Sequence, residues 1–312
     1  MIKQKTIAGE ICIKGKGIHT GYETTLCFKP AEENTGYTFV RTDLPGKPQI
    51  PALADNVFDT SRGSSLRNGE AVVRTIEHVL AAVVGCDIDN IIIELDHEET
   101  PIIDGSSKHF TEALLKTGIR EQNAERKVYE IPTRCYLKDE EKDVEMYLIP
   151  DEEYRITTMV DYNSSVLGTQ NAKLKNVAEF NEHFSAARTF VFLSEVQALL
   201  KHNLIQGGDI KNAIVFVDKI LSQDELDYLA TVFNQPRVSV LEEGILNNVE
   251  LNYPNEPARH KTLDVLGDLA LVGLRFTGHV MANKPGHKTN VEFAKLIRNK
   301  IQETYGNTSL PH

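Results

Sequence analysis

The chain has 312 residues, a formal net charge of −11 and 41% hydrophobic residues. These values are typical of a globular protein with about two domains. They exclude general binding to nucleic acid or insertion at anionic membranes, because both need a basic surface. No leader sequence or membrane-spanning run is expected, so we predict a cytoplasmic protein. The cysteines are scattered without a Cys-x-x-Cys pair, and we expect reduced core residues at all four positions: Cys12, Cys27, Cys86 and Cys135.

Residues 1–122 are predicted to form a first α/β domain. Its opening strands are expected at 6–13 and 24–29, with a glycine-rich turn between them in which His19 is a turn residue rather than a ligand. A helix, a buried strand and a second helix should follow, at about 72–85, at 91–95 and at about 107–117. The polar segment 122–126 is the best candidate for a linker.

Residues 127–306 are predicted to form a second α/β domain. Its expected strands and short segments are 127–136, 144–149, 154–162, a capped segment at 180–188, an amphipathic helix at 193–202 and a strand at 213–217. The last third repeats the helix, strand, turn and helix of the first domain, at about 258–272, 275–283, 284–287 and about 289–303. The fold class is therefore predicted to be α+β, as two related two-layer α/β sandwich domains, each with a small insert, packed with the active site between them.

Two of the predicted helices carry residues that suit a catalytic metal. His260 and Asp264 are four residues apart, so they lie one turn apart on the same helical face. His78, on the equivalent helix of the first domain, is the best third ligand. Three protein ligands with one open position are typical of catalytic zinc, and Glu77 would then act as general base toward an activated water. The alternative is that both histidines are structural residues of amphipathic helices.

Further polar residues fit the same chemistry. His287 lies in a Pro-Gly-His turn, where Asp268 could hold and charge it, and an imidazolium there could protonate a leaving nitrogen or stabilise an oxyanion. The hydroxyl of Thr189 could donate to the same oxyanion. Lys261 and Lys284 would give an acidic protein a local basic pocket for an anionic substrate. Taken singly, such residues are more often surface or capping residues.

Several motifs, in order along essentially the whole chain, resemble those of the UDP-3-O-acyl-N-acetylglucosamine deacetylase family. They are Gly-Lys-Gly-Ile-His-Thr-Gly (15–21), Thr-Ile-Glu-His-Val-Leu-Ala-Ala (75–82), Asp-Asn-Ile-Ile-Ile-Glu (89–94), Pro-Ile-Ile-Asp-Gly-Ser (101–106), Ala-Arg-Thr-Phe (187–190), Arg-His-Lys-Thr-Leu-Asp-Val-Leu-Gly-Asp-Leu (259–269) and Lys-Pro-Gly-His (284–287). The resemblance implies a zinc-dependent amidase of lipid A biosynthesis, which removes acetate from the sugar nitrogen of a UDP-glucosamine carrying a 3-O-hydroxyacyl chain.

The resemblance also implies roles for the residues already named: His78, His260 and Asp264 as ligands of one Zn²⁺, Glu77 as base, His287 paired with Asp268 as the protonated histidine, and Thr189 at the oxyanion. Fe²⁺ could occupy the same ligands, and either His287 or Glu77 could protonate the leaving amine. Lys261 and Lys284 would meet the nucleotide sugar.

The resemblance further implies a binding surface for the rest of the substrate. Tyr162 stands where the family usually has a Phe that stacks on uracil, and Phe190 is a further substrate-binding candidate. The insert at about 190–217 would form an apolar passage for the acyl chain, lined by Leu193, Val196, Ile205, Ile210, Ala213 and Val215. Val191 replaces the usual Gly beside this passage. Some members continue into a hydroxyacyl dehydratase domain, so a longer bifunctional chain is expected as one form of this protein.

Two other hypotheses remain open on the residues alone. One is a different zinc hydrolase, such as a peptidase or a simple amidase, which substrate assays would separate. The other is a duplicated α/β binding protein without enzymatic activity, which should contain no stoichiometric zinc.

Overall fold

The structure is a computed structural model, and it describes residues 2–162, 164, 166–195, 212–218, 221–232, 237–241, 244–247 and 249–306. Helices and strands are mixed along the chain, which confirms the predicted α+β class. No helix among these residues is long and apolar enough to cross a membrane.

The two main sheets share a path of five strands, and the second sheet has a sixth strand, β11 (Val128–Glu130), which pairs parallel with its central strand. The first has the order β2 (Ile11–Lys16), β3 (Glu23–Pro30), β9 (Ile91–Leu95), β4 (Tyr37–Arg41) and β5 (Gln49–Pro51). The second has the order β12 (Cys135–Asp139), β13 (Val144–Ile149), β18 (Arg275–Asn283), β14 (Tyr154–Asp161) and β15 (Thr169–Leu174). In both, the central strand (β9 or β18) runs antiparallel to one neighbour and parallel to the other, and a hairpin partner lies at each edge. The predicted repeat is therefore present in the topology, while the domain boundaries at 122 and 127 stay a prediction.

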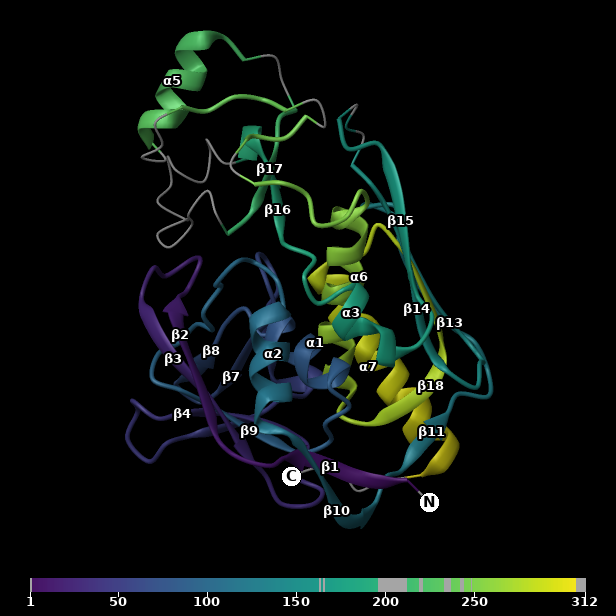
Figure 1. Cartoon of the computed structure of the whole chain (residues 1–312). Helices are drawn as coiled ribbons and strands as arrows, with labels where there is room; N and C mark the ends of the chain where they lie inside the picture. Colours follow the sequence, from purple (N-terminus) through teal and green to yellow (C-terminus); the bar gives the residue numbers. More distant parts are fainter. Residues whose placement is uncertain are drawn as a thin grey trace.

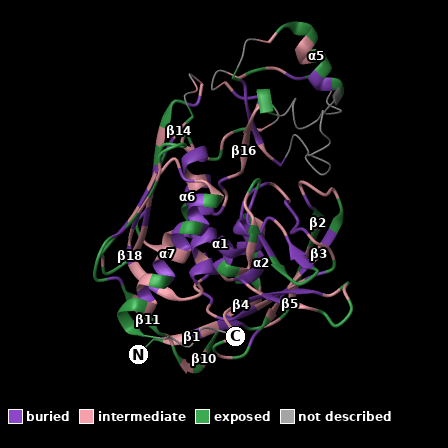
Figure 2. Cartoon of the chain, turned by 180° about the vertical axis from the view of Figure 1, so that it is seen from behind, coloured by how far each residue is buried: buried purple, intermediate pink, exposed green. Residues whose placement is uncertain are grey.

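Four helices lie between the two sheets (Figure 1). In each half one helix precedes the central strand and another follows it: α1 (Glu77–Gly85) and α2 (Lys108–Thr117) in the first half, α6 (Glu256–Leu269) and α7 (His287–Tyr305) in the second. Every residue of α1 is buried, as expected for a helix covered on all sides. Figure 2 shows that burial is concentrated in these central helices. The helices α1 and α6, which carry the predicted metal ligands, occupy equivalent places.

Each half carries an insert between its last hairpin and its first central helix. The first insert contains η1 (Ala54–Asn56), β6 (Val57–Asp59), β7 (Ser65–Asn68) and β8 (Ala71–Val73). The second contains η2 (Val177–Glu179), α3 (Phe180–His183), β16 (Phe190–Phe192), β17 (Ile214–Phe216) and α5 (Gln223–Val232), of which β16, β17 and α5 project from one end of the molecule (Figure 1). The short elements β1 (Lys3–Ile7), β10 (Ile119–Glu125), β11 (Val128–Glu130) and η3 (Ala270–Val272) complete the described structure.

The first central helix begins later than the sequence indicated. We predicted a helix from about residue 72, but β8 occupies Ala71–Val73 and α1 begins at Glu77. The β-branched pair at 72–73 favours a strand, and Thr75 has a φ of 58°, in the left-handed region that a helix cannot continue through. Glu77 and His78 therefore lie in the first turn of the helix.

Two predicted strands are each divided, and the predicted linker is a strand. Residues 6–13 belong to β1 and β2, which separate at Gly9, and 127–136 belong to β11 and β12. The segment 122–126 falls largely within β10, which pairs antiparallel with β1. Its polar side chains are not linker residues, because Arg126 bonds Asp87 and Asp89 and thereby ties this strand to the first half. Of the helix predicted at 193–202, all but the first three residues lie outside the described residues.

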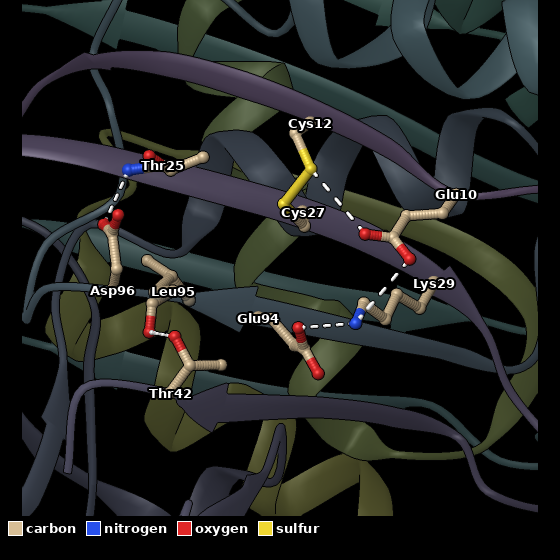
Figure 3. The surroundings of a disulfide bond; sticks show 9 residues. All are labelled: Glu10, Cys12, Thr25, Cys27, Lys29, Thr42, Glu94, Leu95 and Asp96. Atoms are coloured by element: carbon tan, nitrogen blue, oxygen red, sulfur yellow. Dashed lines mark hydrogen bonds and ion pairs between the residues drawn. A yellow bond between two sulfur atoms is a disulfide. The ribbon is translucent and has the colours of Figure 1, made fainter.

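Two of the four cysteines are oxidised, so the prediction that all four are reduced core residues is wrong for these two. Cys86 and Cys135 are free and buried, as predicted, but Cys12 and Cys27 form a disulfide (Figure 3). These two residues are direct partners in the register of β2 and β3, on a partly exposed face of the sheet. Side chains directly opposite one another on antiparallel strands lie within reach of each other, and that pairing could not be known without the strand register.

Candidate metal centre

The close approach of α1 and α6 brings the predicted ligands together. Gly267 on α6 makes this approach possible, since a Cβ atom at this position would lie 2.1 Å from the carbonyl oxygen of Glu77. No side chain fits at that distance. The first turn of α1 is therefore packed directly against the last turn of α6, close to His260 and Asp264, which lie one turn apart on the same helix.

His78, His260 and Asp264 form one buried cluster. Each offers one nitrogen or oxygen atom, and these three atoms lie within 4.8 Å of one another. The Oδ1 atom of Asp264 is 3.3 Å from Nε2 of His260 and 3.8 Å from Nε2 of His78, and among the described residues no hydrogen bond reaches it. A buried carboxylate oxygen without a partner, facing two imidazole nitrogens, fits a cation with nitrogen and oxygen ligands.

The hydrogen bonds and pKa values of the cluster favour the protonation states that bind a cation. Burial and the neighbouring His260 lower the pKa of His78 to about 3, and burial lowers the pKa of His260, so both imidazoles are neutral. His260 donates from Nδ1 to the Ala187 carbonyl at 3.0 Å, which leaves Nε2 with its lone pair toward the cluster. Lys261 donates to Oδ2 of Asp264 at 2.8 Å. Burial opposes ionisation of Asp264, but the neighbouring His260 and Lys261 outweigh this effect and lower the pKa of the Asp264 carboxyl.

A second cluster lies beside the first and contains Glu77, Asp268 and His287. His287 bonds Asp268 through Nδ1 at 2.9 Å, and its Nε2 is 3.9 Å from Oε1 of Glu77 and 4.0 Å from Oδ2 of Asp264. The free nitrogen of His287 therefore points into the space between the base candidate and the metal ligands. Asp268 is fully buried, and it holds the imidazole in this orientation.

The two groups that face each other both have raised pKa values. Burial, with the nearby carboxylates of Asp268 and Asp264, raises the pKa of Glu77 to about 7 against the opposing effect of His287. Burial disfavours the His287 imidazolium, but the carboxylates of Asp268 and Glu77 outweigh that cost and raise its pKa to about 9. Near neutral pH the site therefore holds a carboxylate able to accept a proton and an imidazolium able to donate one.

Two residues of this site were missed by the sequence reasoning. Ser64 donates its backbone N–H to Oε2 of Glu77 at 2.9 Å and its hydroxyl to Oδ1 of Asp268 at 2.5 Å, so it links both acids. Asn290 donates to Oδ2 of Asp268 at 2.8 Å. Asn290 lies one turn after His287 on α7, so helical spacing from His287 could have identified Asn290 as a residue of the site. Nothing in the sequence near Ser64 marks it.

The backbone of Thr189 bonds the first half of the molecule on one side and the insert of the second half on the other. Its backbone N–H donates to the Gly105 carbonyl at 2.8 Å, and its carbonyl accepts from the N–H of Ile214 at 2.9 Å. Gly105 has a φ of 83°, and a Cβ atom there would meet the backbone oxygen of Asn212 at 2.2 Å, so only glycine fits this crossing. Thr189 is two residues from Ala187, which bonds His260, and this places it on the segment beside the metal cluster.

Three of the predicted substrate-binding residues, Tyr162, Phe190 and Lys261, lie near His260 in the first half of α6. Tyr162 packs edge-on against Phe190 with ring centroids 5.5 Å apart, and the Phe190 ring is 6.4 Å from that of His260. The Lys261 ammonium is 5.8 Å from the centre of the Phe190 ring. Lys284 is on the loop before α7 and forms an ion pair with Asp143 at 2.8 Å.

The predicted acyl-passage residues are described only in part. Leu193 and Val215 are buried in a small second hydrophobic cluster of the insert, with Val217, Leu229 and Leu246. Ala213 is partly buried and directly precedes β17. The other three predicted lining residues, Val196, Ile205 and Ile210, lie outside the described residues.

The sequence matches a family model described as UDP-3-O-acyl N-acetylglycosamine deacetylase, over residues 4–232 and 234–299. It is 45% identical over 303 residues to a protein of Porphyromonas gingivalis named bifunctional enzyme LpxC/FabZ, covering 97% of this chain and 66% of the relative. A protein of the same name from Chlorobaculum tepidum is 46% identical, with 98% and 67% covered. The UDP-3-O-acyl-N-acetylglucosamine deacetylase of Chlamydia pneumoniae is 35% identical, with 96% and 98% covered. The chain thus spans about two thirds of the length of the bifunctional relatives.

Proposed function

This chain belongs to the UDP-3-O-acyl N-acetylglycosamine deacetylase family, and on that premise we propose that it hydrolyses the N-acetyl group of UDP-3-O-(3-hydroxyacyl)-N-acetylglucosamine and releases acetate, in lipid A biosynthesis. The observation that carries the proposal is the pairing of a buried cluster with a second cluster in which Glu77 and Asp268 are buried and His287 is partly buried. One offers three ligands with a carboxylate oxygen that lacks a partner, and the other offers a base and an acid.

His78, His260 and Asp264 would hold one Zn²⁺, and Fe²⁺ suits the same donors. The cation supplies positive charge that polarises an amide carbonyl and makes water a better nucleophile at neutral pH. Its ligands are already neutral imidazoles and an ionised carboxylate, so binding needs no costly deprotonation.

Glu77 would act as the general base. The Ser64 N–H holds its Oε2, and this leaves Oε1 directed toward His287 and the space between the clusters. A carboxylate with a pKa of about 7 accepts a proton from water more readily than an ordinary glutamate does. The attack of water on the acetamide carbon then places negative charge on the carbonyl oxygen.

His287 would stabilise that oxyanion and would be the donor to the leaving amine. Its Nδ1–H is bonded to Asp268, so the Nε2–H of the imidazolium is the proton available to the substrate. The hydroxyl of Thr189 is proposed as a second donor to the oxyanion. Glu77, once protonated, is the alternative donor to the amine.

The rest of the substrate would lie on the second half and its insert. We propose that Lys261 and Lys284 meet the diphosphate, that Tyr162 stacks on the uracil, and that Phe190 packs beside the sugar. The acyl chain would enter the insert, where each buried methylene contributes about 0.8 kcal/mol. The dehydratase fusion and the cytoplasmic location expected from the sequence stay predictions.

The test is deacetylation of the acylated UDP-sugar by purified protein, before and after removal of metal with a chelator. We expect activity to disappear with the metal and to return when Zn²⁺ is added, while peptide amides are not cleaved. Glu77→Ala should retain stoichiometric zinc yet lose turnover by at least about a hundredfold. The exposed Glu112→Ala on α2 is the control. Full turnover in Glu77→Ala would remove the base assignment, and cleavage of peptides alone would remove the substrate assignment.

A further inference from the structure

The loop that joins β6 to β7 in the first insert reaches the metal centre at one of its ends. Its residues change from exposed at Ser61 and Arg62 to buried at Gly63 and Ser64. The carboxylate of Asp59 accepts hydrogen bonds from the backbone N–H and from the hydroxyl of Ser61, at 3.1 Å each, and these bonds shape the turn at the exposed end. The buried end of the loop lies against the first turn of α1, which carries Glu77.

Ser64 attaches the buried end of the loop to α1 and to Glu77. Its carbonyl accepts a hydrogen bond at 3.2 Å from the N–H of Ile76, the residue directly before α1. Its own N–H donates to Oε2 of Glu77 at 2.9 Å, and its hydroxyl donates to Asp268. One oxygen of the Glu77 carboxylate is therefore held by the backbone of the loop, provided that the loop can approach the carboxylate closely.

Gly63 permits this close approach. A Cβ atom at this position would lie 2.7 Å from Oε1 of Glu77 and 3.5 Å from both Cδ and Oε2, and the first of these distances is too short for any side chain. The φ of Gly63 is not in the left-handed region, so the backbone conformation alone does not favour glycine here. The position of the Glu77 carboxylate is what excludes a larger residue.

Glu77 cannot turn away from an added side chain without losing its support. The residue is buried, its Oε2 is bonded to Ser64, and its backbone carbonyl packs against Gly267 of α6. The loop itself could move outward, because a cavity of about 370 Å³ lies beside it and is lined in part by Arg62 and Gly63. That movement would carry the Ser64 N–H away from the carboxylate. Either shift leaves the base without its hydrogen bond.

We propose that Gly63 is a positioning residue of the deacetylation reaction. The absence of a side chain at Gly63 lets the loop close on Glu77, so that Ser64 binds one carboxylate oxygen and the other oxygen is left for the reacting water. The inference rests on the proposed function, since it gives Gly63 a part in placing the proposed base. Correct placement matters because a displacement of about 1 Å in a reacting group can lower the rate about a hundredfold.

The first test is steady-state deacetylation of the acylated UDP-sugar by Gly63→Ala. We expect kcat to fall about tenfold to a hundredfold while KM and zinc content stay unchanged, because the proposed substrate-binding residues and metal ligands keep their side chains. Gly9→Ala is the matched control. Gly9 lies between β1 and β2, where an added Cβ atom has no described neighbour within 4 Å, so this variant should match the unchanged protein in kcat and KM.

A second substitution at Glu77 separates positioning from a general structural effect. Glu77→Asp is shorter by one methylene group and withdraws the carboxylate from Gly63, so Gly63→Ala should change the remaining kcat of Glu77→Asp by less than about twofold. Thermal melting gives a readout that needs no activity. Gly63→Ala should lower the melting temperature of the protein that contains Glu77 but not that of Glu77→Ala, which has room for the added methyl group.

The possible outcomes distinguish this inference from the proposed function. An unchanged protein that does not deacetylate the acylated UDP-sugar would remove the proposed function and the positioning role with it. An active protein whose kcat is unaltered by Gly63→Ala, or a loss of kcat that is equally large in Glu77→Asp, overturns the positioning role alone. If Gly63→Ala does not fold, recovery of folding in Gly63→Ala/Glu77→Ala supports the contact with Glu77, and a double variant that stays unfolded overturns it.

Discussion

Replacing His287 with glutamine should remove the alkaline limb of the pH profile of deacetylation and move the acidic limb to higher pH. The active form needs Glu77 ionised and His287 protonated. The pKa of Glu77 is about 7, so activity should rise with pH through that region, and the pKa of His287 is about 9, so activity should fall above it. One pH unit outside either limit, kcat/KM should be about tenfold below its maximum.

The bound cation and the substitution shift these limits in known directions. A divalent cation favours ionised Glu77 and disfavours the imidazolium, so both limits should lie at or below these two pKa values. In His287→Gln no imidazolium faces Glu77. The positive charge of His287 lowers the pKa of Glu77, so the loss of this charge should move the acidic limb of the profile to higher pH. Removal of the proton donor should also lower the maximal rate by about a hundredfold to ten-thousandfold.

The assay is kcat/KM for the acylated UDP-sugar between pH 5 and pH 10.5, with zinc content measured at each end of that range. His279→Gln is the control, because His279 is a partly buried histidine of β18 that bonds Thr157 at 2.8 Å and has no role in the site. Its profile should match that of the unchanged enzyme. An alkaline limb that persists unchanged in His287→Gln would refute the reasoning.

Three further substitutions test separate features of the site. Gly267→Ala should separate α1 from α6, lowering the free energy of unfolding by about 1–3 kcal/mol in urea titrations and weakening zinc binding, and unchanged stability would show that the helices can adjust. Ser64→Ala removes a hydrogen bond to buried Asp268 and should lower kcat about tenfold to a hundredfold with little change in melting temperature, whereas an effect on stability alone would make Ser64 merely structural. Asp143→Asn should free Lys284 and tighten UDP binding by up to about fivefold in calorimetry at low salt, an effect that must vanish when Lys284 is also replaced by Ala.

Periodic, strongly apolar elements could be predicted from the sequence with accurate bounds. The central strand of the second half was predicted at the residues where β18 lies, and Ile91–Leu95 was recognised as a buried strand from its composition. The metal ligands were accessible because one pair follows helical spacing on α6. The third candidate ligand, His78, was selected because Glu77 directly precedes it on a predicted helix, and the internal repeat supported this choice by making that helix equivalent to the one with His260.

Features that depend on register or backbone geometry could not be predicted in this way. The Cys12–Cys27 disulfide requires the pairing of β2 with β3, and the late start of α1 depends on the left-handed conformation of Thr75. Ser64 reaches Asp268 across 204 positions of the chain. A short polar residue in an irregular insert carries no periodic signal, so only the assembled structure reveals its contacts.

If His78, His260 and Asp264 hold the proposed Zn²⁺, their placement on both repeats would make the cation an assembly factor as well as a cofactor. A polypeptide ending near residue 122 would contain only His78 of the three candidate ligands. The remainder of the chain would contain His260 and Asp264. Neither fragment alone could bind Zn²⁺ strongly, so Zn²⁺ should promote association of the two fragments. Removal of Zn²⁺ from the intact chain should lower the stability of the contact between α1 and α6.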